Sequence, residues 1–211
     1  MILFALSSYA QDTTHMLFNL KKPDYIGIYF APETKWIQFG GSMTSLSGGS
    51  GSILINKKWS LGVSGYYSFD RNYSPASIKP LYLRGGLASG RIEYTPYPNS
   101  ALHVSFPFAV GMGFASADST SERFRGVFDV NNRRDGFRNR ANEYVVIQPA
   151  IHLEANVIRY AKVFIGAGYN IGIRAGTSST RPVPSNAFTG VNLNLGVKFG
   201  YFDYYLHKKS E

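Results

Sequence analysis

The segment VNLNLGVKFGY at residues 191–201 decides the fold of this chain, because apolar and polar side chains alternate along it without an exception. Its odd positions carry Val, Leu, Phe or Tyr, and its even positions carry Asn, Gly or Lys. Successive side chains of a β-strand point to opposite faces, so a period of two residues predicts a strand with one apolar face.

Seven further segments are predicted to be strands. Four alternate regularly, namely Val163–Arg174, Tyr144–Ala155, Leu102–Phe114 and Trp59–Phe69, and three are less regular, namely Leu81–Tyr94, Leu46–Asn56 and Tyr25–Phe39. Within Leu81–Tyr94 the apolar residues change parity, which predicts a β-bulge near Gly85 and Gly86. No segment has the helical period, and after residue 10 no run of about 18 apolar residues suggests a transmembrane helix. The chain is therefore expected to be all-β with eight strands.

The composition of the polar face indicates what surrounds the strands. The chain has 211 residues, 22 of them glycine, and only 17% are charged. The polar faces carry mainly Gly, Ser, Ala and Asn, whereas a sheet facing water would carry Lys, Glu and Thr. Eight strands enclose just enough space for side chains, so small inward residues fit a barrel whose apolar face meets lipid. The prediction is one eight-stranded antiparallel up-and-down transmembrane β-barrel over residues 25–202, and a soluble lipocalin-like barrel is the alternative.

The connections predict the orientation of the barrel. Short turns are expected at 56–58, 96–100 and 156–161, and longer connections at 69–80, 116–142 and 175–187. Outer-membrane barrels have short periplasmic turns and longer external loops, which places both termini in the periplasm. Aromatic residues such as Trp59, Tyr94, Tyr160 and Tyr201 would then form a periplasmic girdle.

The two ends of the chain are expected to lie outside the barrel. Residues 1–10 are an apolar run followed by small residues, which is typical of the end of a signal peptide, although an ordinary apolar amino terminus is the alternative. Residues 11–24 would then be a periplasmic segment, and residues 203–211 a carboxyl-terminal tail.

Several function classes are excluded by composition. The chain has no cysteine, so disulfides, thiol catalysis and cysteine-ligated metals are excluded. The formal net charge is +9, but the Lys and Arg residues are scattered rather than clustered, which argues against nucleic acid as a partner. No cofactor is expected.

A set of Gly- and aromatic-rich motifs carries a family resemblance. They are GIYFAPE at 27–33, GGSG at 48–51, GVSGYY at 62–67, GGLASGRIEY at 85–94, QPAIHLEANV at 148–157 and LGVKFG at 195–200. Over residues 25–202 the chain resembles the small outer-membrane β-barrel proteins of Bacteroidota. The resemblance implies a fold and a location in the outer membrane, and it implies no reaction. Such barrels often end on an aromatic residue that the assembly machinery reads, whereas here Phe199, Tyr201 and Phe202 precede the tail.

The inward-facing charged residues are the first group of candidate site residues. Parity and the expected bulge place four cations inside, Arg84, Arg91, Arg174 and Lys198, and Glu93 and Glu154 would be their buried partners. Together with His103 and His152 these residues are predicted to form a polar plug. Glu93 and His103 are expected to face each other across the hairpin, so Glu93, His103, His152 and Glu154 are also a weaker candidate for a divalent metal site.

The positions of the histidines argue against an enzyme. A hydrolase needs a base within hydrogen-bond reach of its nucleophile. His15 precedes the barrel, His207 lies in the tail, and His103 and His152 point inward, so none reaches the lipid face or an external loop. The carboxylates of the loops show no paired spacing that would indicate an acidic protease.

The segment 117–142 is the second group of candidate residues. It contains six arginines, Arg123, Arg125, Arg133, Arg134, Arg138 and Arg140. Guanidinium groups match phosphates and carboxylates, which are abundant on lipopolysaccharide, so this loop is the expected binding surface, with a merely solvated loop as the alternative.

The expected function is that of a monomeric structural or interaction protein of a Gram-negative outer membrane. Its expected partners are outer-membrane lipid and lipopolysaccharide, the assembly machinery and another envelope protein. A narrow pore is the second candidate function, and a lipid-modifying enzyme or protease is the third.

Overall fold

The computed structural model describes residues 23–68, 72–73, 82–118, 142–177 and 183–205. The strands of these residues are β1 (Tyr25–Phe39), β2 (Ser42–Ile55), β3 (Trp59–Ser68), β4 (Asn72–Tyr73), β5 (Tyr82–Tyr94), β6 (Leu102–Asp118), β7 (Asn142–Ile158), β8 (Ala161–Thr177) and β9 (Gly190–Tyr205). Among the same residues there is no helix with the length and apolar character that a membrane span requires.

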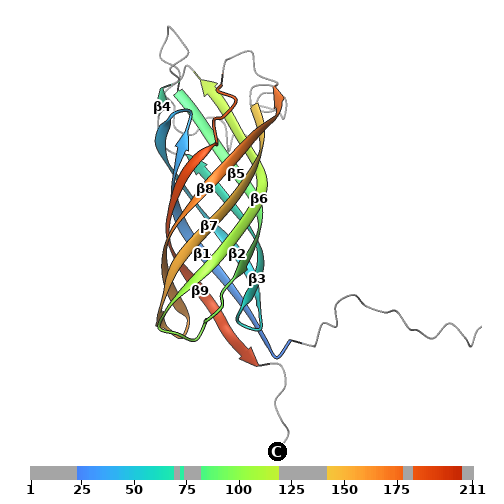
Figure 1. Ribbon diagram of the computed structural model, residues 1–211, viewed down its shortest axis with the longest axis vertical. Helices are drawn as coiled ribbons and strands as arrows, with labels where there is room; N and C mark the ends of the chain where they lie inside the picture. The colour runs from blue at the N-terminus through green and yellow to red at the C-terminus, as the bar shows by residue number, and fades with distance from the viewer. Residues whose placement is uncertain (1–22, 69–71, 74–81, 119–141, 178–182, 206–211) are drawn as a thin grey trace, which may run out of the picture.

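The strands form one closed antiparallel barrel (Figure 1). Neighbours are hydrogen-bonded in the order β3-β2-β1-β9-β8-β7-β6-β5-β4, and a further pairing of β3 with β5 closes the sheet. β4 has only two residues and pairs with β5 beyond the end of β3, so it extends the wall that β3 begins. The predicted eight-stranded up-and-down barrel is confirmed.

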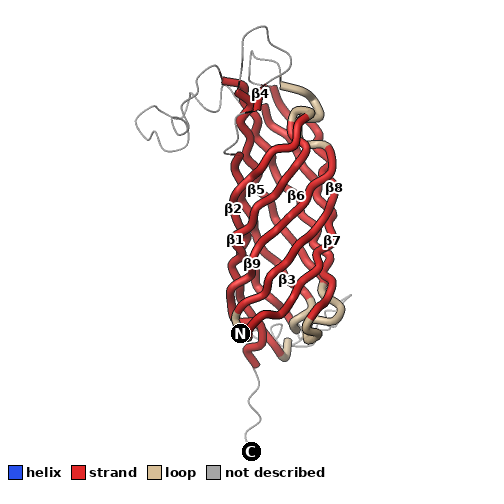
Figure 2. The backbone as a smooth tube through the Cα atoms, turned by 90° about the vertical axis from the view of Figure 1, so that its left-hand side faces the viewer, coloured by secondary structure: helices blue, strands red, loops and turns tan. Residues whose placement is uncertain are grey.

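The two ends of the barrel differ in their connections (Figure 2). At the end where β1 begins and β9 ends, here called the terminal end, the connections are the short segments 56–58, 95–101 and 159–160. At the opposite end, here called the loop end, β6 and β7 are joined by residues 119–141 and β8 and β9 by residues 178–189. The hairpin between β1 and β2 is tight because Gly40 and Gly41 adopt φ of 61° and 92°, which glycine does at little cost.

The two faces of the wall have the predicted assignment. On β9 the side chains of Leu193 and Leu195 are 50% and 49% exposed on the outside, while Asn192 and Asn194 are each 2% exposed inside. The same alternation runs along β1, β7 and β8. The apolar face therefore points outward and the polar face fills the barrel.

The predicted β-bulge in β5 is wrong. Gly86 pairs regularly with Tyr67 on β3 and with Phe114 on β6, and the register continues without a shift through Gly85. Apolar parity changes along β5 because the barrel interior itself changes from polar to apolar toward the loop end. Leu87 is accordingly buried inside, whereas Ile92 is exposed on the outer wall.

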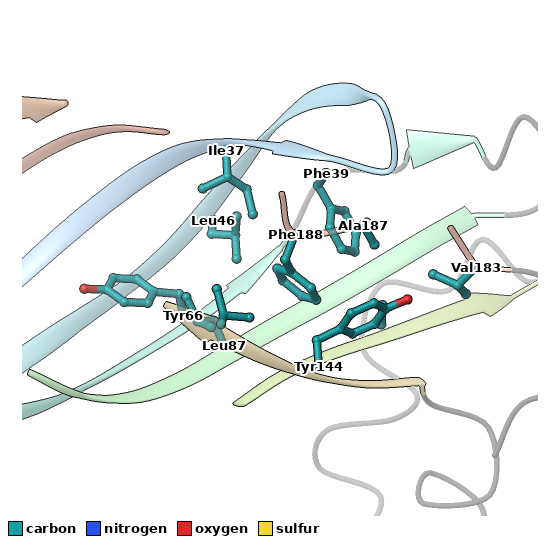
Figure 3. Packing of buried hydrophobic residues seen from close by; sticks show 11 residues of the cluster. Ile37, Phe39, Leu46, Tyr66, Leu87, Tyr144, Val183, Ala187 and Phe188 are labelled. Carbon is teal, nitrogen blue, oxygen red and sulfur yellow. The ribbon is translucent and has the colours of Figure 1, made fainter. Parts of the chain in front are cut away.

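An apolar cluster closes the barrel at the loop end (Figure 3). This cluster, here called the loop-end plug, contains Ile37, Phe39, Leu46, Tyr66, Leu87, Ala115, Tyr144, Val146, Val183, Ala187 and Phe188. Three of its members, Val183, Ala187 and Phe188, come from the described part of the β8–β9 connection, so residues 183–188 enter the barrel. The Phe188 ring lies 4.9 Å from that of Phe39 and 5.3 Å from that of Tyr144.

Two hydrogen bonds to backbone carbonyl groups hold the segment that carries Phe188. The amide of Gly40 donates to the carbonyl oxygen of Ala187 at 3.0 Å. The hydroxyl of Tyr144 donates to the carbonyl oxygen of Pro184 at 2.8 Å. The loop-end plug is thus tied to both the β1–β2 hairpin and β7.

Candidate functional site

Five charged side chains meet inside the barrel in a continuous chain of ion pairs. They are Glu33 on β1, Arg91 and Glu93 on β5, Glu154 on β7 and Lys198 on β9, and they are called the charged cluster below. Arg91 reaches Glu33 at 3.2 Å and Glu93 at 2.6 Å. Lys198 Nζ lies 2.5 Å from a carboxylate oxygen of Glu93 and 2.5 Å from one of Glu154. Glu93 therefore links the arginine to the lysine.

Burial makes these ion pairs obligatory. All five side chains are nearly inaccessible to solvent. An unpaired charge in such surroundings costs several kcal/mol, so each group needs its partner. Hydroxyl groups complete the set, since Arg91 also donates to Ser50 Oγ at 3.3 Å and Ser105 donates to Glu154.

Parity explains why these residues converge. Arg91 and Glu93 are two positions apart on β5, so both point inward. Glu33, Glu154 and Lys198 hold inward positions on three other strands, and the narrow barrel brings them within ion-pair distance. The predicted association of Arg91 and Lys198 with Glu93 and Glu154 is therefore present.

Arg84 and Arg174 are not in the charged cluster. Without a bulge, Arg84 takes the outward parity of β5 and lies half-buried on the outer wall, so its predicted inward position is wrong. Arg174 does point inward, but near the loop end, where it donates to the carbonyl oxygen of Val183 and to the hydroxyl of Tyr144 at 3.4 Å. It supports the loop-end plug instead.

The predicted contact between Glu93 and His103 is also wrong. The pairing of β5 with β6 begins at Tyr94 and Phe106, because residues 102–105 of β6 continue past the end of β5 and pair only with β7, so Glu93 faces Pro107. His103 pairs instead with Glu154 on β7, with 3.5 Å between its Nε2 and the carboxylate. Its Nδ1 lies 3.0 Å from the carbonyl oxygen of Ser100, which only accepts hydrogen bonds.

Three of the four candidate metal ligands do lie together. Potential ligand atoms of Glu93, His152 and Glu154 are within 4.8 Å of one another, and His103 is outside this group. The ammonium of Lys198 lies between the two carboxylates, where a cation bound by both would have to sit. His152 is engaged as well, because its Nε2 is 3.2 Å from Asn194 Nδ2 and its ring stacks on Phe164 at 4.8 Å. This geometry favours the ion-pair cluster over a metal site.

Other inward residues were not predicted as part of the site. Besides Glu33 they include Lys35, whose Nζ lies 4.1 Å from the centre of the Tyr66 ring, and Lys162, whose Nζ lies 4.6 Å from that of Phe202. A layer of amides also crosses the interior, in which Asn170 Oδ1 accepts from Gln148 at 3.0 Å and from Asn192 at 2.7 Å. The signal for Glu33 and Lys35 is in the sequence, because they share the parity of Tyr29 and Ile37 on β1.

No hydrolytic arrangement is found among the described residues. The Ser105 hydroxyl bonds to a carboxylate and not to an imidazole, and Ser105 is completely buried, so no substrate reaches it. His103 and His152 are buried inside the barrel, as predicted. His15 and His207 lie outside the described residues, and so do the six arginines predicted to form the external contact surface.

Comparison with solved structures supports the fold. The chain is similar to the N-terminal β-barrel domain of Pseudomonas aeruginosa OprF, with a TM-score of 0.53 and 11% identity over 83% of this chain and 97% of that one. The TM-score with the outer membrane protein OprG of Pseudomonas aeruginosa is 0.45, at 10% identity over 85% of this chain and 97% of that one. The TM-score with Ail, the attachment invasion locus protein of Yersinia pestis, is 0.42, at 12% identity over 84% of this chain and 97% of that one. No protein-family model and no curated protein sequence matches the chain. At 11% identity the likeness to the OprF domain shows the fold alone.

Proposed function

We propose that this protein is a monomeric β-barrel of a Gram-negative outer membrane that acts as a structural or interaction protein, and neither as an enzyme nor as an open pore. One observation carries the proposal, namely an outer wall of apolar side chains around an interior that is filled at two levels.

The outer wall supports insertion into a membrane. Bulky apolar side chains point outward on most of the strands, as with Val63, Ile165 and Leu195, and a water-soluble protein rarely exposes so large an apolar surface. Aromatic side chains gather at the terminal end, where the rings of Trp59 and Tyr94 are 4.6 Å apart and those of Tyr160 and Tyr201 are 5.4 Å apart. Aromatic girdles of this kind mark the level of lipid headgroups. A soluble lipocalin-like barrel would need the opposite arrangement, with an apolar interior.

The filled interior argues against the pore, which is the second candidate. The charged cluster occupies the cross-section toward the terminal end, and the loop-end plug closes the other side. A solute would have to separate buried ion pairs and also displace Phe188. Insertion into planar lipid bilayers is therefore expected to produce no discrete conductance steps.

The proposed binding surface is the loop end. By analogy with the usual arrangement of short periplasmic turns and long external loops, both termini lie in the periplasm and the connection 119–141 faces outside. Its arginines are suited to phosphate and carboxylate groups of surface glycolipids, and this part of the proposal rests on the sequence. The resemblance to barrels of Bacteroidota is consistent with it.

Cell fractionation and gel mobility test the proposal. The protein is expected in the outer-membrane fraction and should migrate differently on SDS gels before and after boiling. Recovery from the soluble periplasm would instead support the lipocalin-like alternative.

The orientation has its own test. Trypsin added to intact cells should cut within 117–142 and spare the Lys57-Lys58 turn, if lipopolysaccharide leaves the loop accessible. Cleavage at Lys57-Lys58 alone would show that the barrel is inverted.

A further inference from the structure

A groove of about 540 Å³ lies on the outer wall near the loop end, between β2, β3, β5 and β6. It is called the outer groove below. The outward-pointing residues that line it are Ser47, Gly65, Tyr67, Arg84, Gly86, Ala88, Phe114 and Ser116. Its volume is typical of sites that bind small molecules and cofactors.

Small residues create this groove. Much of the outer wall carries Ile, Leu, Val and Phe, whereas here three small residues, Gly65, Gly86 and Ala88, lie side by side on β3 and β5. A Cβ atom added to Gly65 would have no other atom within 4 Å, so the space in front of this residue is open. The rings of Tyr67 and Phe114 line the same groove. The result is an apolar depression in a surface that faces lipid.

The height of Arg84 is the second observation. Arg84 is ten residues from Tyr94, which belongs to the aromatic pair at the terminal end. At about 3.4 Å per residue and a strand tilt of about 35–45°, these residues are about 24–28 Å apart along the barrel axis. The apolar band of such barrels is about 25 Å tall, so Arg84 lies at the opposite membrane interface, at the level of lipid phosphates.

We propose that the outer groove is a binding site for lipopolysaccharide, in which an acyl chain fills the groove and Arg84 binds a phosphate of the lipid A headgroup. The inference rests on the proposed function, because the loop end faces the lipopolysaccharide leaflet only in that orientation. A guanidinium has five N–H donors, so Arg84 binds a phosphate alongside any partner within the protein. The groove opens toward the hydrocarbon region, which explains why an acyl chain rather than a water-soluble ligand fits it.

The test uses the full chain, folded in detergent micelles and titrated with bisphosphorylated lipid A while native mass spectrometry records binding. Arg84→Gln removes the charge, and Gly65→Leu fills the groove from a position where an added Cβ has no other atom within 4 Å. Each substitution is expected to weaken lipid A binding about tenfold, because Arg84→Gln removes a charge-assisted hydrogen bond and Gly65→Leu removes the space for the acyl chain. Arg84→Lys should retain part of the affinity.

Gly90→Leu is the matched control for Gly65→Leu. Gly90 also points outward on β5, lies outside the lining of the groove, and has its nearest neighbouring atom 3.9 Å from an added Cβ. It should bind lipid A as the unmodified protein does. Dephosphorylated lipid A and phosphatidylglycerol should both bind at least tenfold more weakly than bisphosphorylated lipid A.

Several results would overturn the proposal. They are unchanged binding by either Arg84→Gln or Gly65→Leu, an equal loss for Gly90→Leu, or equal binding of phosphatidylglycerol. Heat-dependent gel mobility shows for each variant that the barrel is folded. A barrel that inserts into membranes but binds no lipid A refutes this site alone, whereas one that stays in the soluble periplasm refutes the proposed function.

Discussion

Replacement of Glu93 by alanine should lower the free energy of unfolding by about 3 kcal/mol. Glu93 receives hydrogen bonds from Arg91 at 2.6 Å and from Lys198 at 2.5 Å, so its loss affects two buried cations at once. Breaking a buried ion pair by removing one partner costs about 3–5 kcal/mol. The lower end of this range applies because Arg91 keeps Glu33 at 3.2 Å and Lys198 keeps Glu154 at 2.5 Å.

The assay is reversible unfolding in urea, with the protein inserted in lipid vesicles and the fluorescence of Trp36 and Trp59 as the signal. Glu93→Ala and Lys198→Met are measured singly and together. The double variant removes one charge of each sign. Its loss of unfolding free energy should therefore be about 1–3 kcal/mol smaller than the sum of the two single losses.

Asp203→Ala is the control for the loss of a carboxylate. Asp203 pairs with Arg159 at 3.7 Å in an exposed position, so this substitution should cost less than about 1 kcal/mol. The reasoning is refuted if Glu93→Ala costs no more than Asp203→Ala, or if the effects of Glu93→Ala and Lys198→Met simply add.

Three other substitutions and one chelation experiment test the faces, the loop-end plug and the metal alternative. Leu195→Arg places a charge in lipid and should cost about 2–4 kcal/mol, and a neutral result would mean that the faces are reversed. Gly196→Arg should prevent folding, seen as the absence of a heat-dependent gel shift, because even a Cβ there would lie 2.6 Å from the Phe164 ring and 2.8 Å from Glu33. Phe188→Ala should lower the free energy of unfolding by about 3–5 kcal/mol. It should not open a conducting path, because the charged cluster still closes the barrel, and measurable conductance would contradict closure by the charged cluster. EDTA should leave the melting temperature unchanged if Lys198 rather than a metal holds Glu93 and Glu154, and a clear decrease would favour the metal site.

Local alternation was sufficient to predict the strands and, apart from the start of the 81–94 segment, their faces. Successive side chains of a strand point to opposite faces, so the residue period of two is set within a single segment. The strand at 191–201 shows this, since Leu195 lies outside and Asn194 inside as the alternation predicts.

Part of the interior could also have been predicted better. Glu33 and Lys35 lie on β1, a segment that looks irregular in the sequence because Pro32 interrupts it. Pro32 in fact points outward, and the parity of Tyr29, Ala31 and Ile37 continues through both charged residues. A charged side chain in a membrane-spanning strand is expected to face the interior, and this rule identifies Glu33 as a partner of the inward cations.

The register between strands could not be predicted from either strand alone. The position of Glu93 opposite Pro107, and of His103 opposite Glu154, arises because the start of β6 continues past the end of β5 and pairs only with β7, an offset that accompanies the stagger of strands in the closed barrel. The outward position of Arg84 has a different cause, because the apolar residues of β5 change face without a bulge. Leu87 is apolar yet points inward because residues from other strands and from the 183–188 segment make the loop end of the interior apolar.

The sequence by itself determined that this chain forms eight amphipathic strands with the polar side inside, because alternation, small inward residues and turn spacing are properties of short segments. Only the tertiary structure decided which inward charges meet, that residues 183–188 enter the barrel, and that a groove with Arg84 at its edge lies on the outer wall. These features join residues up to 165 positions apart, such as Glu33 and Lys198 in the charged cluster. Their distances depend on closure and shear of the whole barrel, and no single segment contains that information.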